Sequence, residues 1–388
     1  MTMADHGDGD QGTGHSFRVT RTNLADGREL LYFDDDPAFV SGERTRELTD
    51  RRDLPPAATQ SEMRQDPLTG QWYVYAAHRM NRTFMPPANE NPLAPTRPGE
   101  LPTEIPADEY DVVVFENRFP SLSMHTAPAA SAQVDGDSLF PRAAAVGRCE
   151  VVCFTSDATL SFRDLPLRRA RTVVEAWAHR TRELGELPGV KYVYPFENRG
   201  AEIGVTLQHP HGQIYAYPFV PPRAAEIAER SAAYWREHGR DLFTDVLAAE
   251  VRAGTRIIAQ GEHFTAYVPA AAKWPVEAML MPNRPVANFA ELAAAEKHEL
   301  TVMYLDLLRR VDRFFEGVDR TPYIASWNQA PVGGAAQGCG GMRLYLQLYS
   351  MMRSPGRMKF LAGSESGQEA WISDTTPEAI AQRLRDIA

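Results

Sequence analysis

The chain has 388 residues, 43% of them hydrophobic, which suits a folded protein of one large or two medium domains. Its formal net charge of −10 argues against a broad binding surface for nucleic acid or an anionic membrane, since both require a positive field. No apolar run approaches the length of a membrane span, there is no apolar signal core, and three cysteines are too few for a disulfide framework. We therefore expect a cytoplasmic protein with free thiols.

In the first half of the chain, residues 1–16 are rich in Gly and Asp, which predicts a disordered tail. A helix is expected over 166–184, with an N-terminal signal at Ser161 to Asp164. Strands are expected at 71–75, 110–117, 147–154 and 190–197.

The stretch 204–217 is the centre of the prediction. Read as one strand with a period of two, it places His209, His211, Gln213 and Tyr215 on the same face. A neutral imidazole can act as a nucleophile near pH 7 when its other nitrogen is held by an acceptor. Gly212 has no side chain, which would let a phosphate approach the main chain beside His211.

Two other interpretations of the His-x-His pair stay open on the residues alone. The pair could hold a metal, or both imidazoles could be satisfied structural groups. The remaining histidines outside the N-terminal tail stand alone in the sequence and are poorer candidates for catalysis.

The second half repeats the order of the first. Strands are expected at 263–268, 276–281, 323–327 and 342–349, with a long helix over 289–316 between the two pairs. We interpret this as an internal duplication with halves 17–222 and 223–388. In it, residues 344–349 occupy the place that 208–213 fill in the first half, without imidazoles.

Four segments resemble a known family. The string His-Pro-His-Gly-Gln at 209–213 resembles the active-site strand of galactose-1-phosphate uridylyltransferases, a branch of the histidine-triad superfamily. Phe-Glu-Asn-Arg-Gly at 196–200 is similar to the family's Phe-Glu-Asn-Lys-Gly, and Asp-Pro-Leu-Thr-Gly at 66–70 with the following strand and two arginines is similar to another family segment. The stretch 357–365 resembles Lys-Phe-x-x-Gly-x-Glu. The resemblance implies an α+β fold of two histidine-triad-like halves that share a large, mainly antiparallel sheet with packed helices.

The resemblance also implies an activity. UDP-glucose and galactose 1-phosphate would exchange a uridylyl group through a covalent adduct on His211, with help from Gln213. Glucose 1-phosphate and UDP-galactose would be the products, as in the Leloir pathway of galactose metabolism. The implied assembly is a homodimer with shared active sites.

The substrate-binding residues are carried over from the matching motifs. Without the resemblance, the two arginines after the strand are ordinary solvated residues and 357–365 is an exposed turn with ordinary charges. The implied set is Arg79 and Arg82 for the phosphates, Asn117 for the uridine, Asn198, Gly204 and Thr206 for the phosphates, and Lys359, Phe360 and Glu365 for the sugar phosphate across the dimer.

The metal sites of the family are not matched. Many relatives hold a structural zinc with a Cys-x-x-Cys pair, which is replaced here by Asn91 and Ala94, while a later histidine falls near Ala158. His209 is the only surviving candidate ligand, and a closed zinc site needs four. A second metal of some relatives would fall on Asn328, Tyr345 and Gln347. We expect no metal and no cofactor.

Two departures keep other functions open. Arg118 stands where family members often have Asp, and Ser364 stands where they commonly have Tyr. A related nucleotidyltransferase or phosphorylase acting on another nucleotide sugar is therefore an alternative. A binding or regulatory protein without the chemistry is a second alternative, and the intact 209–213 string argues against it.

Overall fold

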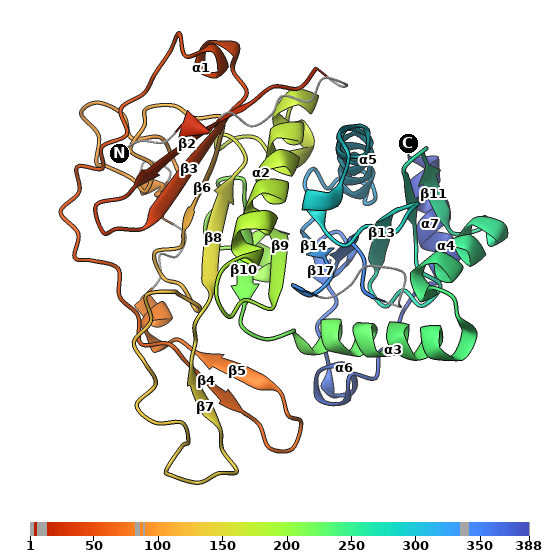
Figure 1. Ribbon diagram of the computed structural model, residues 1–388. Coiled ribbons are helices and arrows are strands. Elements are labelled where there is room, and N and C mark those ends of the chain that lie inside the picture. Colours follow the sequence, from red (N-terminus) through yellow and green to blue (C-terminus); the bar gives the residue numbers. More distant parts are fainter. Residues whose placement is uncertain (1–3, 6–13, 82–85, 88–89, 334–340, 388) are drawn as a thin grey trace.

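The computed structural model describes residues 4–5, 14–81, 86–87, 90–333 and 341–387. Within these residues, twelve strands form one large sheet and seven α-helices are present (Figure 1). Every neighbouring pair of strands in the large sheet is antiparallel. The predicted α+β class is confirmed.

The strands of the large sheet, in spatial order, are β1 (Ala4–Asp5), β2 (Arg18–Asn23), β3 (Glu29–Asp34), β6 (Val112–Glu116), β8 (Arg148–Cys153), β10 (His211–Tyr217), β9 (Tyr192–Arg199), β14 (Tyr323–Asn328), β15 (Tyr345–Ser350), β13 (Val276–Pro282), β12 (Phe264–Tyr267) and β11 (Ile257–Gln260).

The order of the strands is mirrored about the pair β9–β14. Outward from this seam the first half runs β9, β10, β8, β6, and the second half runs β14, β15, β13, β12. The long helix of each half follows the strand in the third of these positions. This arrangement agrees with the duplication that the sequence suggested, and it places β15 where the first half has β10.

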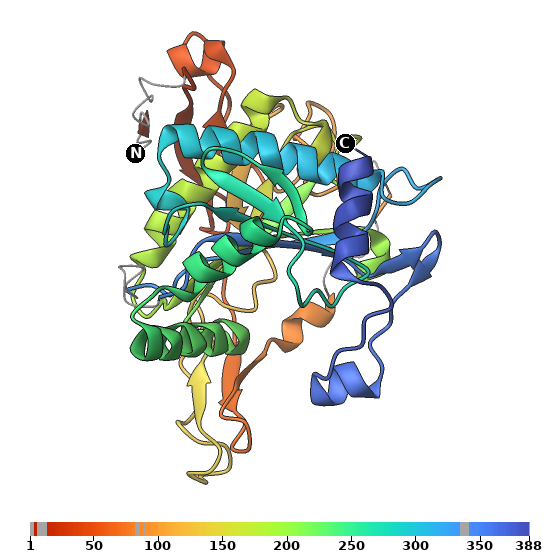
Figure 2. The ribbon, with the colours of Figure 1, turned by 90° about the vertical axis from the view of Figure 1, so that its right-hand side faces the viewer.

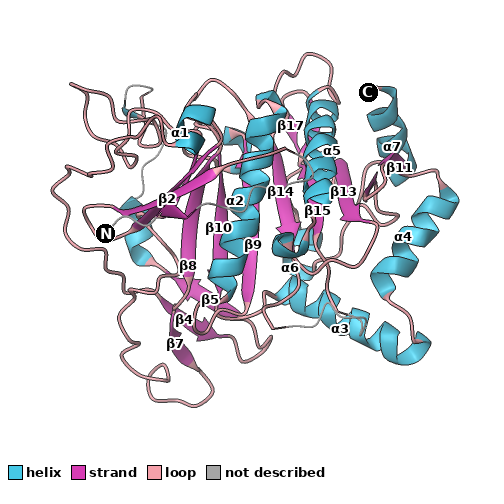
Figure 3. Ribbon diagram, turned by 45° about the horizontal axis from the view of Figure 1, so that its top comes forward, coloured by secondary structure: helices cyan, strands magenta, loops and turns pink. Residues whose placement is uncertain are grey.

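The helices cover both faces of the sheet. They are α1 (Pro37–Ser41), α2 (Leu167–Gly185), α3 (Pro222–His238), α4 (Leu242–Ala253), α5 (Ala294–Asp312), α6 (Gly363–Gln368) and α7 (Pro377–Asp386). Figure 3 shows α2 and α5 lying side by side across one face. Side chains of α3 and α4, including Phe243 and Leu247, pack with Tyr345 on the second half's strands.

Helix α2 (Leu167–Gly185) agrees with its predicted bounds to within one residue at each end, whereas its N-terminal signal and the second long helix differ from the prediction. Ser161 and Asp164 do cap a helical turn, since the Asp164 carboxylate accepts from the Ser161 backbone N–H at 2.9 Å. That turn is a short 3₁₀ segment, Phe162–Asp164, and α2 begins after it. The helix expected over 289–316 begins only at Ala294, where Glu296 caps the Ala293 N–H at 2.7 Å, and it ends at Asp312.

One continuous apolar core lies between the sheet and helices α2 and α5. Trp177 of α2 is 2% exposed and stands at its centre. Its ring lies 5.8 Å from that of Phe162 and 5.4 and 5.6 Å from those of Phe289 and Trp327, measured between centroids. Because the last two residues belong to the second half, this tryptophan joins the halves through packing.

A second, smaller sheet contains β4 (Glu62–Gln65), β5 (Trp72–Tyr75) and β7 (Arg142–Ala144), in the order β5-β4-β7. It projects from the main body on the same side as α6 (Figures 1 and 2). A short hairpin of β16 (Met352–Ser354) and β17 (Arg357–Met358) precedes α6. Within the predicted tail, β1 pairs with β2, and the His15 ring lies 3.2 Å from the Thr172 hydroxyl.

Glu197 is a buried carboxyl group on the helix-covered face of β9. It accepts from the Tyr323 hydroxyl at 2.9 Å and from the Tyr304 hydroxyl at 3.4 Å. Burial raises the pKa of Glu197 to about 7, although the Arg199 charge opposes the shift. The folded protein therefore holds a proton on this group in a pH range where the unfolded chain has lost it.

Replacing Glu197 with Gln is expected to flatten the pH dependence of stability. In the wild type, the free energy of unfolding falls as the pH rises from the ordinary glutamate value through the folded pKa, by on the order of 3 kcal/mol. Glu197→Gln escapes this loss and is expected to be the more stable protein at pH 8. Urea unfolding at pH 5.5 and pH 8 measures the difference, with Glu229→Gln on the exposed face of α3 as the control. Equal pH dependence in both variants would contradict the assignment.

Candidate active site

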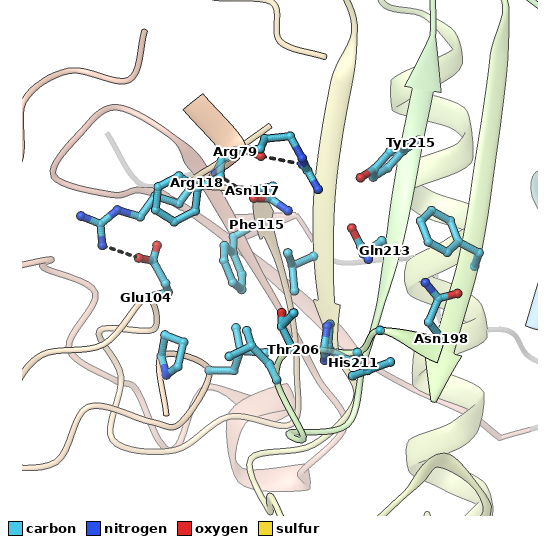
Figure 4. Close-up of a pocket in the computed structure, with 18 residues that line it drawn as sticks. Arg79, Glu104, Phe115, Asn117, Arg118, Asn198, Thr206, His211, Gln213 and Tyr215 are labelled. Atoms are coloured by element: carbon cyan, nitrogen blue, oxygen red, sulfur yellow. Dashed lines mark hydrogen bonds and ion pairs between the residues drawn. The ribbon is translucent and has the colours of Figure 1, made fainter. Parts of the chain in front are cut away.

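A cavity of about 410 Å³ opens on the sheet face opposite α2 and α5 (Figure 4). The strands β6, β8, β9 and β10 form its floor, and the segments 92–93 and 204–207 form part of its wall. It is lined by Arg79, Pro92, Leu93, Glu104, Phe115, Asn117, Arg118, Phe119, Val151, Phe196, Asn198, Gly204, Val205, Thr206, Leu207, His211, Gln213 and Tyr215.

The predicted strand 204–217 is shorter than expected. β10 begins only at His211, and its burial alternates from there to Tyr217, so that His211, Gln213 and Tyr215 face the cavity together as predicted. Residues 204–210 form a loop. His209 therefore does not share the strand face. It belongs to this loop, and it is only 3% exposed.

One nitrogen of the His211 ring is held by a hydrogen bond, and the other has no hydrogen-bond partner among the described residues. Its Nδ1 lies 2.7 Å from the backbone carbonyl oxygen of His209, and because a carbonyl can only accept, Nδ1 carries the proton. Nε2 therefore has the lone pair when the ring is neutral. Burial lowers the pKa of His211 below the usual histidine value, against the opposing effect of this hydrogen bond, and so favours the neutral ring. This is the arrangement that a nucleophilic imidazole needs.

Polar side chains surround His211 (Figure 4). Gln213 follows it along β10, and Asn198 lies on the neighbouring β9. Thr206 and Gly204 contribute from the loop, where Gly204 takes a φ of +82° that favours glycine. Asn198 and His211 also border an adjoining cavity of about 270 Å³.

Arg79 and Asn117 lie on the other wall of the cavity. The Arg79 guanidinium donates to the Phe119 carbonyl at 2.7 Å, which directs the side chain along this wall. Arg82, the second predicted arginine, lies outside the described residues, as does Cys339.

Gly212 has a structural role that the sequence did not reveal. It faces away from the cavity, and a Cβ there would lie 2.9 Å from Cζ of Phe154 and 2.9 Å from the Phe196 carbonyl oxygen. The groups that approach Gly212 closely are thus a core side chain and the neighbouring strand. The prediction that a phosphate would approach the main chain at Gly212 was wrong.

Gly212→Ala is expected to lower the free energy of unfolding by about 1–3 kcal/mol, since the added methyl overpacks a filled region. It should also lower kcat by shifting His211. Chemical denaturation and steady-state kinetics measure the two effects. Gly367→Ala is the control, because its Cβ would meet nothing within 4 Å. If Gly212→Ala kept the wild-type free energy of unfolding, β10 would have to shift to accommodate the methyl group, and the overpacking argument would be wrong.

A charged network closes the end of the cavity farthest from His211. Glu104 is 5% exposed and pairs with Arg28 at 2.6 Å, Arg52 at 2.8 Å and Arg118 at 3.4 Å. Only Arg118 in this group is half-exposed. Glu104 and the apolar lining residues Phe115 and Val151 were missed by the sequence reasoning, although both apolar residues lie on strands it predicted.

Comparison with known proteins agrees with this geometry. Residues 47–221 match the family model described as galactose-1-phosphate uridyl transferase, N-terminal domain, and residues 228–388 match the model of its C-terminal domain. The chain belongs to the galactose-1-phosphate uridylyltransferase family. It is therefore an enzyme, a nucleotidyltransferase.

Individual members of the family are similar over nearly their whole length. The galactose-1-phosphate uridylyltransferase of Streptomyces lividans is 44% identical over 378 residues, which are 96% of this chain and 98% of the relative. That of Thermotoga maritima is 34% identical over 84% of this chain and 98% of its own length. A solved uridylyltransferase structure, 30% identical, superimposes with a TM-score of 0.73 over 84% of this chain and 98% of the other.

The segment resembling the family's sugar-phosphate motif lies away from the cavity. Lys359 and Glu365 are 5% and 7% exposed and pair with each other at 3.4 Å, and the Lys359 ammonium also donates to the Ile372 carbonyl. Phe360 is 83% exposed. None of these three residues lines the cavity of its own chain.

The residues at the family's zinc position do not fit a metal. The Asn91 amide nitrogen lies 3.0 Å from Nδ1 of His209, and Nε2 of His209 lies 2.7 Å from the Thr155 carbonyl oxygen, so both ring nitrogens have protein partners. Burial, ahead of the other causes, lowers the pKa of His209 to about 4. Among the described residues, no group of three or more His, Cys, Asp or Glu side chains is placed to hold a metal ion.

In the described part of the chain, no helix is long and apolar enough to cross a membrane.

Proposed function

We propose that this enzyme transfers a uridylyl group between UDP-glucose and galactose 1-phosphate by a two-step exchange on His211. The observation that carries the proposal is the hydrogen bond from Nδ1 of His211 to the His209 carbonyl at 2.7 Å. It leaves Nε2 unprotonated in a cavity whose polar side chains suit a nucleoside diphosphate sugar.

In the first step, Nε2 of His211 attacks the α-phosphorus of UDP-glucose. A nitrogen–phosphorus bond forms as the bond from that phosphorus to the bridging oxygen breaks, and the electron pair leaves with glucose 1-phosphate. The imidazole becomes positively charged, and the His209 carbonyl stabilises that charge through the Nδ1–H. Gln213, Asn198 and Thr206 line the cavity and would donate to phosphate oxygens without titrating.

In the second step, a phosphate oxygen of galactose 1-phosphate attacks the same phosphorus. The nitrogen–phosphorus bond breaks, UDP-galactose leaves, and His211 returns neutral with its Nδ1 proton in place. One set of groups serves both sugars because the two half-reactions are chemically alike, so the kinetics are ping-pong. Arg79 on the opposite wall offsets the phosphate charge in both steps.

We further propose that a second copy of the chain completes the site. Phe360, Leu361 and Ile372 are 83%, 41% and 60% exposed, which supports a role for this C-terminal segment in contact with a partner. In the dimer, Lys359, Phe360 and Glu365 of one copy would reach the sugar phosphate in the cavity of the other.

Mapping of the covalent adduct tests the exchange. The purified protein is incubated with UDP-glucose and without acceptor, digested, and analysed by mass spectrometry. The expected result is a uridylyl group on the peptide that contains His211, released when galactose 1-phosphate is added. A uridylyl group on another residue, or turnover without any adduct, would overturn the mechanism.

A second candidate is transfer from another nucleotide sugar on the same histidine. It is favoured by Arg118, a half-exposed residue of the cavity wall whose guanidinium contacts Glu104 at 3.4 Å and lies 5.7 Å from the centre of the Phe119 ring. Parallel exchange assays with UDP-glucose and ADP-glucose separate the two candidates, and a higher kcat/KM with ADP-glucose would favour the second.

A further inference from the structure

The segment 91–93 contributes to the cavity wall, and it also contacts the ring of His209. We propose that Asn91 and Tyr110 are positioning residues that fix the His209 ring and, through the His209 carbonyl, the attacking nitrogen of His211. In this chain, a network of uncharged hydrogen bonds would thus do the work of a structural metal. The proposal rests on the proposed role of His211 as nucleophile.

Asn91 determines one side of the His209 ring. Its amide oxygen accepts from the Leu93 backbone N–H at 3.0 Å, which turns its amide nitrogen toward Nδ1 of His209, 3.0 Å away. An amide nitrogen can only donate, so Nδ1 must accept. The proton of the neutral ring is therefore on Nε2.

The partners of Nε2 of His209 independently indicate the same tautomer. Nε2 lies 2.7 Å from the Thr155 carbonyl oxygen, which can only accept, and 2.7 Å from the Tyr110 hydroxyl oxygen. That hydroxyl donates to the Leu93 carbonyl at 2.8 Å, so its lone pairs remain for His209. Both nitrogens are thus satisfied by neutral partners, in a ring that is 3% exposed.

The His209 backbone transmits this placement to the nucleophile. Its carbonyl oxygen accepts from Nδ1 of His211, and the next carbonyl, that of Pro210, accepts from the Phe154 N–H at 3.2 Å. A His209 ring that turned would carry its carbonyl away from His211 and release Nδ1. The two opposite tautomers, Nε2–H in His209 and Nδ1–H in His211, are therefore parts of one network.

Nitrogen NMR of the ¹⁵N-histidine-labelled full-length protein tests the network. Neutral His209 should show the Nε2–H tautomer and neutral His211 the Nδ1–H tautomer, with resonances assigned from His209→Gln and His211→Gly. Asn91→Asp has nearly the same shape, but a carboxylate only accepts, so it should move a proton onto Nδ1 of His209. Its kcat is expected to fall about 10- to 100-fold with KM changed less than about threefold, since a small misplacement of a reacting atom has effects of this size.

Two further variants keep the test decisive. Tyr110→Phe removes one hydroxyl and should lower kcat by a smaller factor without reversing the His209 tautomer. Asn283→Ala is the control, because that side-chain amide is likewise a hydrogen-bond donor, to backbone carbonyls at 2.9 and 3.3 Å, but it lies in the other half of the chain. It should leave kcat and both tautomers unchanged. If Asn91→Asp fails to fold, Asn91→Ala and Tyr110→Phe carry the comparison of kcat with KM.

The outcomes distinguish this inference from the proposed function. An unchanged His209 tautomer and unchanged kcat in Asn91→Asp would overturn the inference, as would one equivalent of zinc in the purified protein whose removal shifts the His209 resonances. Tautomers that respond as expected in a protein that forms no uridylyl adduct on His211 would leave the His209 network standing and refute the exchange mechanism.

Discussion

Replacing His211 with Gly is expected to lower the rate of uridylyl transfer by about 10⁴- to 10⁶-fold, the size of effect seen when a catalytic nucleophile is removed. The binding of UDP-glucose should change little, because the cavity walls and the polar groups of Asn198 and Gln213 remain. The expected signature is therefore a loss of kcat with a nearly unchanged dissociation constant, measured by steady-state kinetics and calorimetric titration.

The control for this variant is His263→Gly. His263 lies in the turn between β11 and β12 in the second half and does not line either cavity beside His211. It should keep wild-type kinetics and should still form the adduct. Near wild-type turnover by His211→Gly would remove this residue from the mechanism, whereas loss of UDP-glucose binding would assign it to substrate binding.

Replacing Trp177 with Ala is expected to lower the free energy of unfolding by about 3–5 kcal/mol, because the change leaves a large cavity in a closely packed core. The ring stands among Phe154 and Phe162 of the first half and Phe289 and Trp327 of the second. The substitution therefore weakens the packing of both helices on the sheet. Denaturant unfolding followed by circular dichroism measures the loss.

Trp235→Ala provides the comparison for this prediction. Trp235 lies on α3 and is only partly buried, so the same change of side chain should have a much smaller effect. If both variants lost the same free energy of unfolding, the contacts of Trp177 with the second half would contribute no stability beyond that of ordinary burial.

Local patterns in the sequence predicted the elements that carry chemistry. The alternation from His211 to Tyr217 placed Gln213 on the same face as His211, and β15 lies in the position expected from the repeated order of elements. The boundary of β10 was not predictable in this way, because residues 205–208 also alternate between apolar and polar side chains, although in the opposite phase, and they form no strand. A period of two describes side chains, whereas a strand also requires partners for its backbone.

Contacts between distant segments explain most of the other differences. The partners of His209 come from residues 91, 110 and 155, and those of Glu104 from residues 28, 52 and 118. No local pattern reports such pairs. Helices α3 and α4 were not predicted, although Pro222 and Gly239 bound the first and Asp241 caps the second. The proposed role of Lys359 and Phe360 requires a second chain, which a pattern in one sequence cannot place.

In the second half, α3 and α4 lie on the sheet face that the first half leaves open for its cavity. The Phe243 ring stands 5.8 Å from that of Tyr345, on the strand equivalent to β10, and Leu247 packs into the same cluster. In the second half, packed helices thus occupy the sheet face that carries the cavity in the first half. The repeated strand of the second half therefore contributes to packing and not to the cavity beside His211.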